Sequence, residues 1–159
     1  MYSLYTLMLS KQEWGNITWK LFHTLCVKIK QDSLYIIPAL LNEFYIICHN
    51  LPCPECSNHA VNYFRNINMN NLNSREKLCI TMNDFHNAVN INLNKPTLTL
   101  HDSIDKYSYL NTYHVVREFI NVFSKSTGSH LLMMRNMHKN IIVNRFREFM
   151  NSHIKHFEN

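Results

Sequence analysis

Two cysteines, Cys53 and Cys56, are the residues of this chain best placed to do chemistry. Residues 51–56 read Leu-Pro-Cys-Pro-Glu-Cys. Because proline is tolerated in the first turn of a helix but not in its interior, this segment predicts a helix that begins here. Cysteines at i and i+3 in a helical first turn have Cα atoms about 5 to 6 Å apart, a distance that a disulfide spans. The unpaired N–H groups and the dipole at that helix end would favour a thiolate, which thiol–disulfide exchange requires.

The same spacing also occurs in zinc sites. His59, three residues after Cys56, could be a third ligand, and Cys48 or His49 could complete the set. No second Cys-x-x-Cys or His-x-His pair follows at zinc-finger spacing, and long apolar helices form a core without a metal. These residues alone therefore leave open a redox dithiol and a zinc-stabilised helical binding module that uses Cys53, Cys56 and His59. A flavin-free thioredoxin-like carrier is disfavoured, because alternating strand segments are missing.

Composition and periodicity predict an all-α chain. Only 2 Gly and 4 Pro occur, and 46% of the residues are hydrophobic, which favours helices over a many-stranded sheet. Apolar residues at every fourth position predict a helix over 17–29, and a second helix over 38–49 should pack against it as an antiparallel pair. Further helices are expected over 53–64 and 78–93, with a loop over 66–73.

The pattern is less regular beyond Pro96. Residues 103–123 are expected to hold one or two short helices, and Gly128 marks a break. The last thirty or so residues look helical again. Their apolar residues near one face are Met134, Met137, Ile141, Phe146 and Phe149.

Charge and hydropathy argue against several classes of protein. The net charge is +5, but Lys and Arg are scattered with no run of four, so we expect a solvated basic surface and no nucleic-acid partner. No stretch approaches the ~20 apolar residues of a membrane span, and residues 1–10 lack the features of a signal peptide. Five cysteines are too few and too unevenly spaced for a disulfide-stapled secreted scaffold.

Three segments, read in order, carry a more specific signal. They are Trp14-Gly15-x-x-x-Trp19-x-x-x-His23, Leu51-Pro52-Cys53-Pro54-Glu55-Cys56-x-x-His59 and His86-Asn87-x-Val89-Asn90-x-x-Leu93-x-Lys95-Pro96. In this order and at these separations they resemble the Erv/ALR family of FAD-linked sulfhydryl oxidases. The resemblance covers about residues 13–97, with Trp14 expected just before the first helix.

The resemblance implies a four-helix bundle with a short fifth helix, holding FAD at the mouth of the bundle, followed by a C-terminal helical extension. It implies that Cys53 exchanges with a reduced protein substrate or a thioredoxin-like carrier, while Cys56 faces the flavin. Electrons would pass from this dithiol through FAD to O₂, giving hydrogen peroxide, and no metal is required. The expected cofactor-binding residues are Gly15, Trp19, His23, His59, His86, Asn87, Asn90 and Lys95.

The chain departs from the family pattern in several places. Asn16 stands where many members have a basic residue, and Ala60 where many have Phe. A late Trp that often touches the nucleotide is absent, and Tyr107 or Tyr109 are the candidates to replace it. The second, flexible cysteine pair of many cellular members is also absent, so a substrate must reach Cys53 directly. The remaining thiols, expected to be buried and unreactive, are Cys26, Cys48 and Cys79.

The expected organisation is a lead-in over 1–12, the sulfhydryl oxidase domain over 13–110 and a helical extension over 111–159. The compact arrangement looks like the short members encoded by large cytoplasmic DNA viruses. We therefore expect a homodimer in the cytoplasm of an infected host cell, with the virion as a second location. If the chain is cellular, the expected compartment is the mitochondrial intermembrane space.

Overall fold

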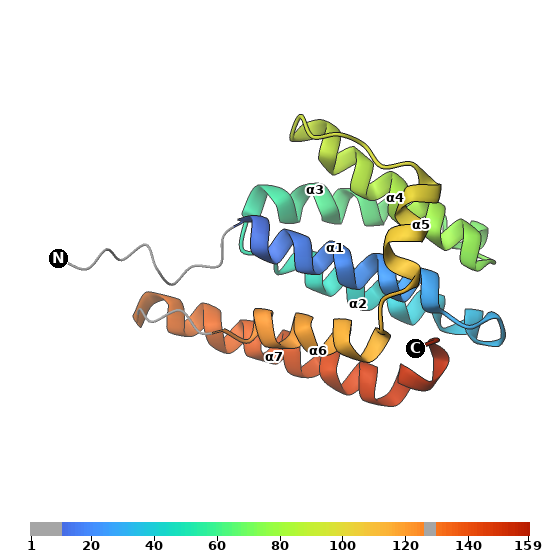
Figure 1. The fold of residues 1–159 in the computed structure, drawn as a ribbon. Helices are drawn as coiled ribbons and strands as arrows, with labels where there is room; N and C mark the ends of the chain where they lie inside the picture. Colours follow the sequence, from blue (N-terminus) through green and yellow to red (C-terminus); the bar gives the residue numbers. More distant parts are fainter. Residues whose placement is uncertain (1–10, 126–129) are drawn as a thin grey trace.

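The computed structural model describes residues 11–125 and 130–159 of the chain, and their backbone is almost entirely helical (Figure 1). An isolated bridge between Ile29 and Phe157 is the only β-pairing in these ranges. The expected all-α fold is therefore confirmed. The helices are α1 (Lys11–Lys28), α2 (Ile37–His49), α3 (Pro54–Arg65), α4 (Arg75–Asn92), α5 (Leu100–Ser108), α6 (Thr112–Phe123) and α7 (His130–His153), with 3-10 turns at Gln31–Ile36, Met69–Asn71 and Ile154–His156.

Polar N-caps fix where several of these helices begin. The side chains of Ser74, Thr99 and Asn111 each accept a hydrogen bond from the backbone N–H three residues later, at the start of α4, α5 and α6. These bonds satisfy N–H groups that have no partner inside the helix. Pro38 stands in the first turn of α2, where a missing N–H costs nothing.

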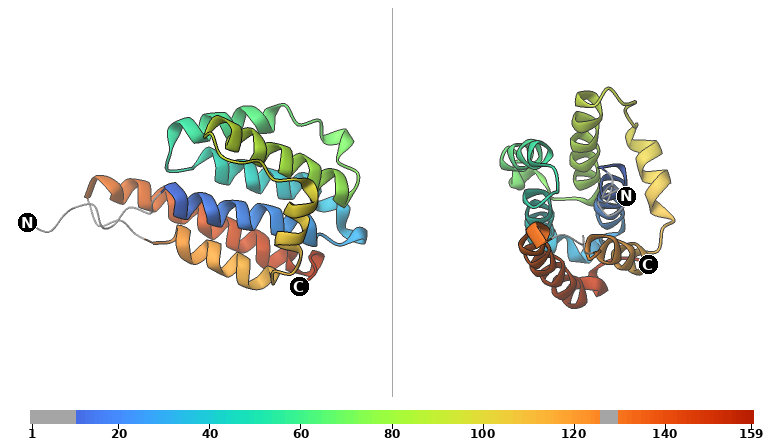
Figure 2. Two further views of the ribbon diagram at one scale, coloured as in Figure 1. Left: turned by 45° about the horizontal axis from the view of Figure 1, so that its top comes forward. Right: turned by 90° about the vertical axis from the view of Figure 1, so that its left-hand side faces the viewer.

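Helix α1 is the centre of the bundle (Figure 2). It packs against α4 and α5 on one side and against α6 on the other. Helix α2 returns antiparallel to α1, as expected, and the two meet through Phe22 and Phe44, whose stacked ring centroids are 4.1 Å apart. Helix α3 packs on α2, and it also meets α4 directly, where the ring centroid of Tyr63 lies 4.6 Å from that of Phe85.

The C-terminal helices share the hydrophobic core of the bundle. Phe119 of α6 and Phe146 of α7 are buried in the same cluster as Leu21 of α1, and the two phenyl rings meet edge to face at 5.3 Å. The guanidinium of Arg145 lies 2.9 Å from the buried carboxylate of Glu43 on α2. In the described ranges, no helix combines the length and the apolarity needed to cross a membrane.

Two expectations about helix ends and faces are wrong. Trp14 does not precede the first helix, because α1 starts at Lys11 and buries Trp14 in the core. The apolar residues of α7 do not share one face: Met137 and Ile141 are 68% and 63% exposed, whereas Phe146 is fully buried. Five residues turn a helix through about 500°, which places Ile141 and Phe146 well apart around the axis. Gly128 and the side chain of Met134 lie outside the described residues.

Candidate active site

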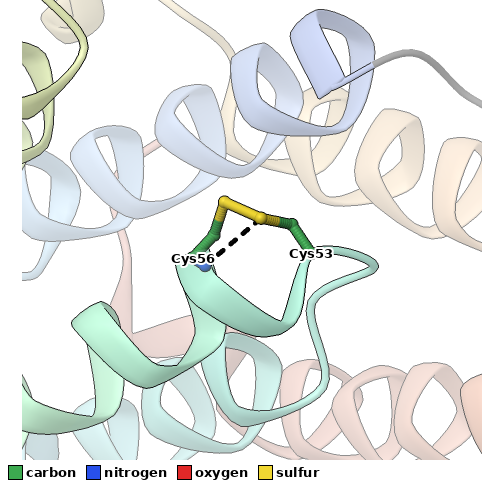
Figure 3. The surroundings of a disulfide bond; sticks show 2 residues. All are labelled: Cys53 and Cys56. Carbon is green, nitrogen blue, oxygen red and sulfur yellow. Dashed lines mark hydrogen bonds between the residues drawn. A yellow bond between two sulfur atoms is a disulfide. The ribbon is translucent and has the colours of Figure 1, made fainter.

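The first turn of α3 holds a disulfide between Cys53 and Cys56, with 5.2 Å between the two Cα atoms (Figure 3). Cys53 is the N-cap residue, and its sulfur accepts a hydrogen bond of 3.2 Å from the N–H of Cys56. Both residues are partly exposed. After reduction, this N–H and the helix dipole favour the thiolate of Cys53, so the pair is suited to thiol–disulfide exchange.

A second group of side chains, from α1, α4 and α5, forms a buried aromatic cluster. Trp19 stacks on His86 with ring centroids 4.1 Å apart, and His23 stacks on Tyr107 at 4.6 Å. The two histidines are joined by a contact of 2.9 Å between His23 Nε2 and His86 Nδ1. Ser103 Oγ lies 3.1 Å from the other ring nitrogen of His23. The structure thus brings together three residues that the sequence motifs singled out.

Burial keeps both histidines neutral at pH 7. Burial, together with the neighbouring His86 and Lys106, lowers the pKa of His23 to about 3. Burial likewise lowers the pKa of His86 to about 4, with contributions from the cations of Lys106 and Lys95. Two lysines therefore place positive charge close to the aromatic cluster.

A cleft of about 510 Å³ lies between α3 and α4, a size typical of ligand-binding pockets. His59, one turn after Cys56, lines it together with the rings of Tyr63 and Phe85. Phe85 also joins the cleft to the aromatic cluster, since its ring centroid lies 4.6 Å from that of Tyr63 and 5.0 Å from that of Trp19. The lining is rich in amide side chains, namely Asn62, Asn66, Asn68, Asn71 and Asn92.

The amide of Asn87 is used within the protein. Its Nδ2 donates to the carbonyl of Leu98 at 2.8 Å, and its Oδ1 accepts from the N–H of Leu98 at 2.9 Å. Asn83 donates to the same carbonyl at 3.2 Å. These bonds hold the segment 93–99 along α4, so the side chain of Asn87 positions this segment.

The remaining predicted residues are placed as follows. Asn90 is buried and Lys95 is exposed beside the turn that ends α4. A Cβ added at Gly15 would meet nothing within 4 Å, so no contact in the structure requires glycine there. The part that Gly15 plays in binding a cofactor stays a prediction.

Comparison with known proteins assigns the chain to a family. The sequence model of the Erv1 / Alr family matches residues 16–110. The chain belongs to the Erv1 / Alr family. Two relatives of this Erv1 / Alr chain, both provisionally named FAD-linked sulfhydryl oxidases, come from invertebrate iridescent viruses.

The relative from Invertebrate iridescent virus 3 is 32% identical over 96 residues, which cover 59% of this chain and 65% of the relative. The relative from Invertebrate iridescent virus 6 is 33% identical over 95 residues, which cover 54% of this chain and 83% of the relative. The Erv1 / Alr chain thus spans slightly less than two thirds of the first relative's length. No solved structure matches the chain significantly.

The alternatives to a redox dithiol lose support in this Erv1 / Alr chain. The zinc-stabilised module needs Cys53, Cys56 and His59 as ligands, but the two sulfurs are bonded to each other. Among the described residues, no group of three or more His, Cys, Asp or Glu side chains could hold a metal. A thioredoxin-like carrier requires a sheet, and the described residues form none.

Sequence reasoning missed part of the surroundings of His23. Ser103 was not singled out, and Lys106 was not assigned to the site. The available signal was the spacing of Ser103 and Tyr107, four residues apart on one face of a short helix. The structure also separates the two tyrosine candidates, since Tyr107 is 4% exposed and Tyr109 is 76% exposed.

Proposed function

We propose that this protein is an FAD-linked sulfhydryl oxidase that forms disulfides in protein substrates. The observation that carries the proposal is the Cys53–Cys56 disulfide in the first turn of α3. It lies one helical turn before His59, which lines the cleft between α3 and α4. Membership of the Erv1 / Alr family and the names of the two viral relatives support it. The dithiol supplies electrons, and the cleft supplies space for an acceptor.

The residues around the cleft fit the parts of FAD. Trp19, Tyr63 and Phe85 offer flat faces to ring systems, and the lining asparagines offer donors and acceptors. Lys95 and Lys106, which both act on the pKa of His86, would hold the pyrophosphate. The other residues proposed to bind FAD are Gly15, His23, His59, His86, Asn87 and Asn90. When bound, FAD supplies a two-electron acceptor that O₂ reoxidises, giving hydrogen peroxide.

The chain's own cysteines carry the exchange. A substrate thiolate attacks Cys53 Sγ, forming a mixed disulfide and releasing the Cys56 thiolate. A second substrate thiolate attacks the substrate sulfur of that bond, which releases the substrate disulfide and the Cys53 thiolate. Two electrons then reside on the Cys53/Cys56 dithiol. All five cysteines lie in the described ranges and the other three are buried, so the substrate or a thioredoxin-like carrier meets Cys53 directly.

The finer assignments rest on the viral relatives and on the family. We propose a homodimer that acts in the cytoplasm of an infected host cell and in the virion. Measurement of the molecular mass in solution tests the dimer. Immunoelectron microscopy of infected cells and purified virions tests the location.

An absorption spectrum and an oxygen electrode test the function together. The purified protein should be yellow, with flavin absorbance, and should consume O₂ when dithiothreitol is added. A colourless protein that binds no added FAD would overturn the proposal. Stoichiometric zinc without flavin would instead support the binding module.

A further inference from the structure

A chain of hydrogen bonds joins three helices inside the aromatic cluster. Ser103 of α5 contacts Nδ1 of His23 on α1 at 3.1 Å, and Nε2 of His23 contacts Nδ1 of His86 on α4 at 2.9 Å. The three residues are 3%, 4% and 8% exposed. Bonds this deeply buried are shielded from competition by water, so their direction matters energetically.

The serine hydroxyl determines which group donates and which accepts in each of these hydrogen bonds. Among the described residues, His23 Nδ1 is the sole hydrogen-bond partner of Ser103 Oγ. If the hydroxyl donates, His23 carries its proton on Nε2 and donates to His86 Nδ1, so the proton of His86 lies on Nε2. In the opposite direction the hydroxyl hydrogen would be buried without an acceptor, which is costly. The neutral state of both rings gives each ring one N–H, as either direction requires.

We propose that Ser103 is a positioning residue that fixes the proton of His86 on Nε2 and thereby presents an N–H donor to the bound cofactor. In the described part of the chain, His86 Nε2 makes no hydrogen bond to the protein, and it is not fully buried. It is therefore accessible to an acceptor on a ligand. This assignment rests on the proposed function for the identity of the acceptor, a carbonyl, ring nitrogen or phosphate oxygen of FAD.

Replacement of the serine should release the choice of tautomer. In Ser103→Ala, either direction of the hydrogen bonds leaves His23 Nδ1 without a partner, so the two directions become similar in energy. Ser103→Thr keeps the hydroxyl. Ser108→Ala is the matched control, because Ser108 stands on the same helix and, among the described residues, its hydroxyl contacts only the carbonyl of Asp105.

The direct measurement is the ¹⁵N chemical shift of the ring nitrogens in purified protein with labelled histidine. Wild type, Ser103→Thr and Ser108→Ala should show His86 protonated on Nε2, and Ser103→Ala should show a mixture of tautomers. An unchanged His86 tautomer in Ser103→Ala would overturn the assignment. So would protonation on Nδ1 in the wild type. This readout does not depend on bound flavin or on activity.

The second measurement is the affinity for FAD, followed by quenching of flavin fluorescence. Loss of one well-aligned hydrogen bond should weaken binding about five- to tenfold in Ser103→Ala, with recovery in Ser103→Thr. Equal affinity in wild type and Ser103→Ala would contradict the role toward the cofactor. If no variant and no wild-type sample binds FAD, the proposed function fails, while the tautomer measurement still decides whether Ser103 positions His86.

Discussion

At the scale of single residues, Cys53 differs from the three isolated cysteines in its surroundings. Its sulfur accepts a hydrogen bond from the backbone N–H of Cys56 at the start of α3, and such a bond stabilises a thiolate. Burial instead raises the pKa of Cys26 and Cys48, and it raises that of Cys79 to about 11. Reactivity should therefore be confined to the disulfide pair.

Replacement of either cysteine of the pair should stop catalysis. Cys53→Ser and Cys56→Ser are each expected to lower O₂ consumption with dithiothreitol at least 100-fold while FAD remains bound, because exchange needs both sulfurs. The measurement is oxygen-electrode turnover beside the flavin spectrum. Cys26→Ser is the control and should affect stability more than turnover. Near-normal activity in Cys53→Ser would refute its assigned role.

The two buried histidines should make folding stability depend on pH. Their native pKa values of about 3 and 4 lie below the ordinary value of 6.5, so the unfolded chain binds protons first as the pH falls. Stability present above pH 6.5 is thus lost progressively toward pH 3, by about 2 to 4 kcal/mol between pH 7 and pH 5. Urea denaturation at several pH values measures this.

The control for this pH dependence is a histidine on the surface, His101. His23→Gln should flatten the dependence between pH 7 and pH 5, whereas His101→Gln, on the surface of α5, should leave it unchanged. The same slope in His23→Gln and wild type would show that other groups, such as carboxylates, control acid unfolding.

At the scale of elements, the end of α4 determines where Lys95, which we propose binds the cofactor, is placed. Asn94 adopts φ 54°, and the N–H groups of Asn94 and Lys95 bond to the carbonyls of Ile91 and Asn90 at 3.1 and 2.8 Å. This pair of bonds is a Schellman motif, which ends a helix and reverses the chain. The turn directs residues 95–98 back along α4, where Asn87 holds Leu98.

A β-branched residue at the left-handed position should weaken this turn. Asn94→Val is expected to lower the free energy of unfolding by about 1 to 2 kcal/mol, while Asn94→Gly should change it by less than about 0.5 kcal/mol. Chemical denaturation gives both values. Asn92→Val, in the last turn of α4 with ordinary helical geometry, is the control. Equal losses in Asn92→Val and Asn94→Val would argue against the turn as the cause.

The helices themselves could be predicted from the sequence, but their contacts could not. Period-four apolar residues located α1, α2 and α4, and two prolines located the start of α3, because burial of one face dictates these patterns. The meeting of Ser103 with His23 and of Asn87 with Leu98 depends on how α5 and the segment before it pack. Such contacts between distant residues leave no periodic signal in a single sequence.

At the scale of the whole molecule, the bundle and the C-terminal helices are one packed body in the described ranges. The expected boundary at residue 110 falls between α5 and α6, yet Val115, Phe119 and Phe146 lie in the core that contains Leu25. The sequence pattern did not show this, since it grouped the exposed Met137 and Ile141 with the buried Phe146 on one face of α7. The ion pair of Glu43 with Arg145 adds a polar link.

Loss of that ion pair should destabilise the whole fold. Arg145→Ala leaves the carboxylate of Glu43, 6% exposed, without its partner, and is expected to cost about 2 kcal/mol. Urea denaturation measures the loss. Arg147→Ala should cost less than about 0.5 kcal/mol, because within the described ranges the Arg147 side chain bonds only the exposed Asn144. Addition of Glu43→Gln to Arg145→Ala should restore part of the stability.

The central position of α1 has a consequence for how the chain folds during synthesis. Its packing partners α4 and α6 begin at residues 75 and 112, and Lys30 bonds to the carbonyl of His156. A ribosome that has translated only as far as residue 100 therefore presents α1 with one side uncovered. Since distant contacts form slowly, the nascent chain carries an aggregation-prone apolar stripe until α6 emerges.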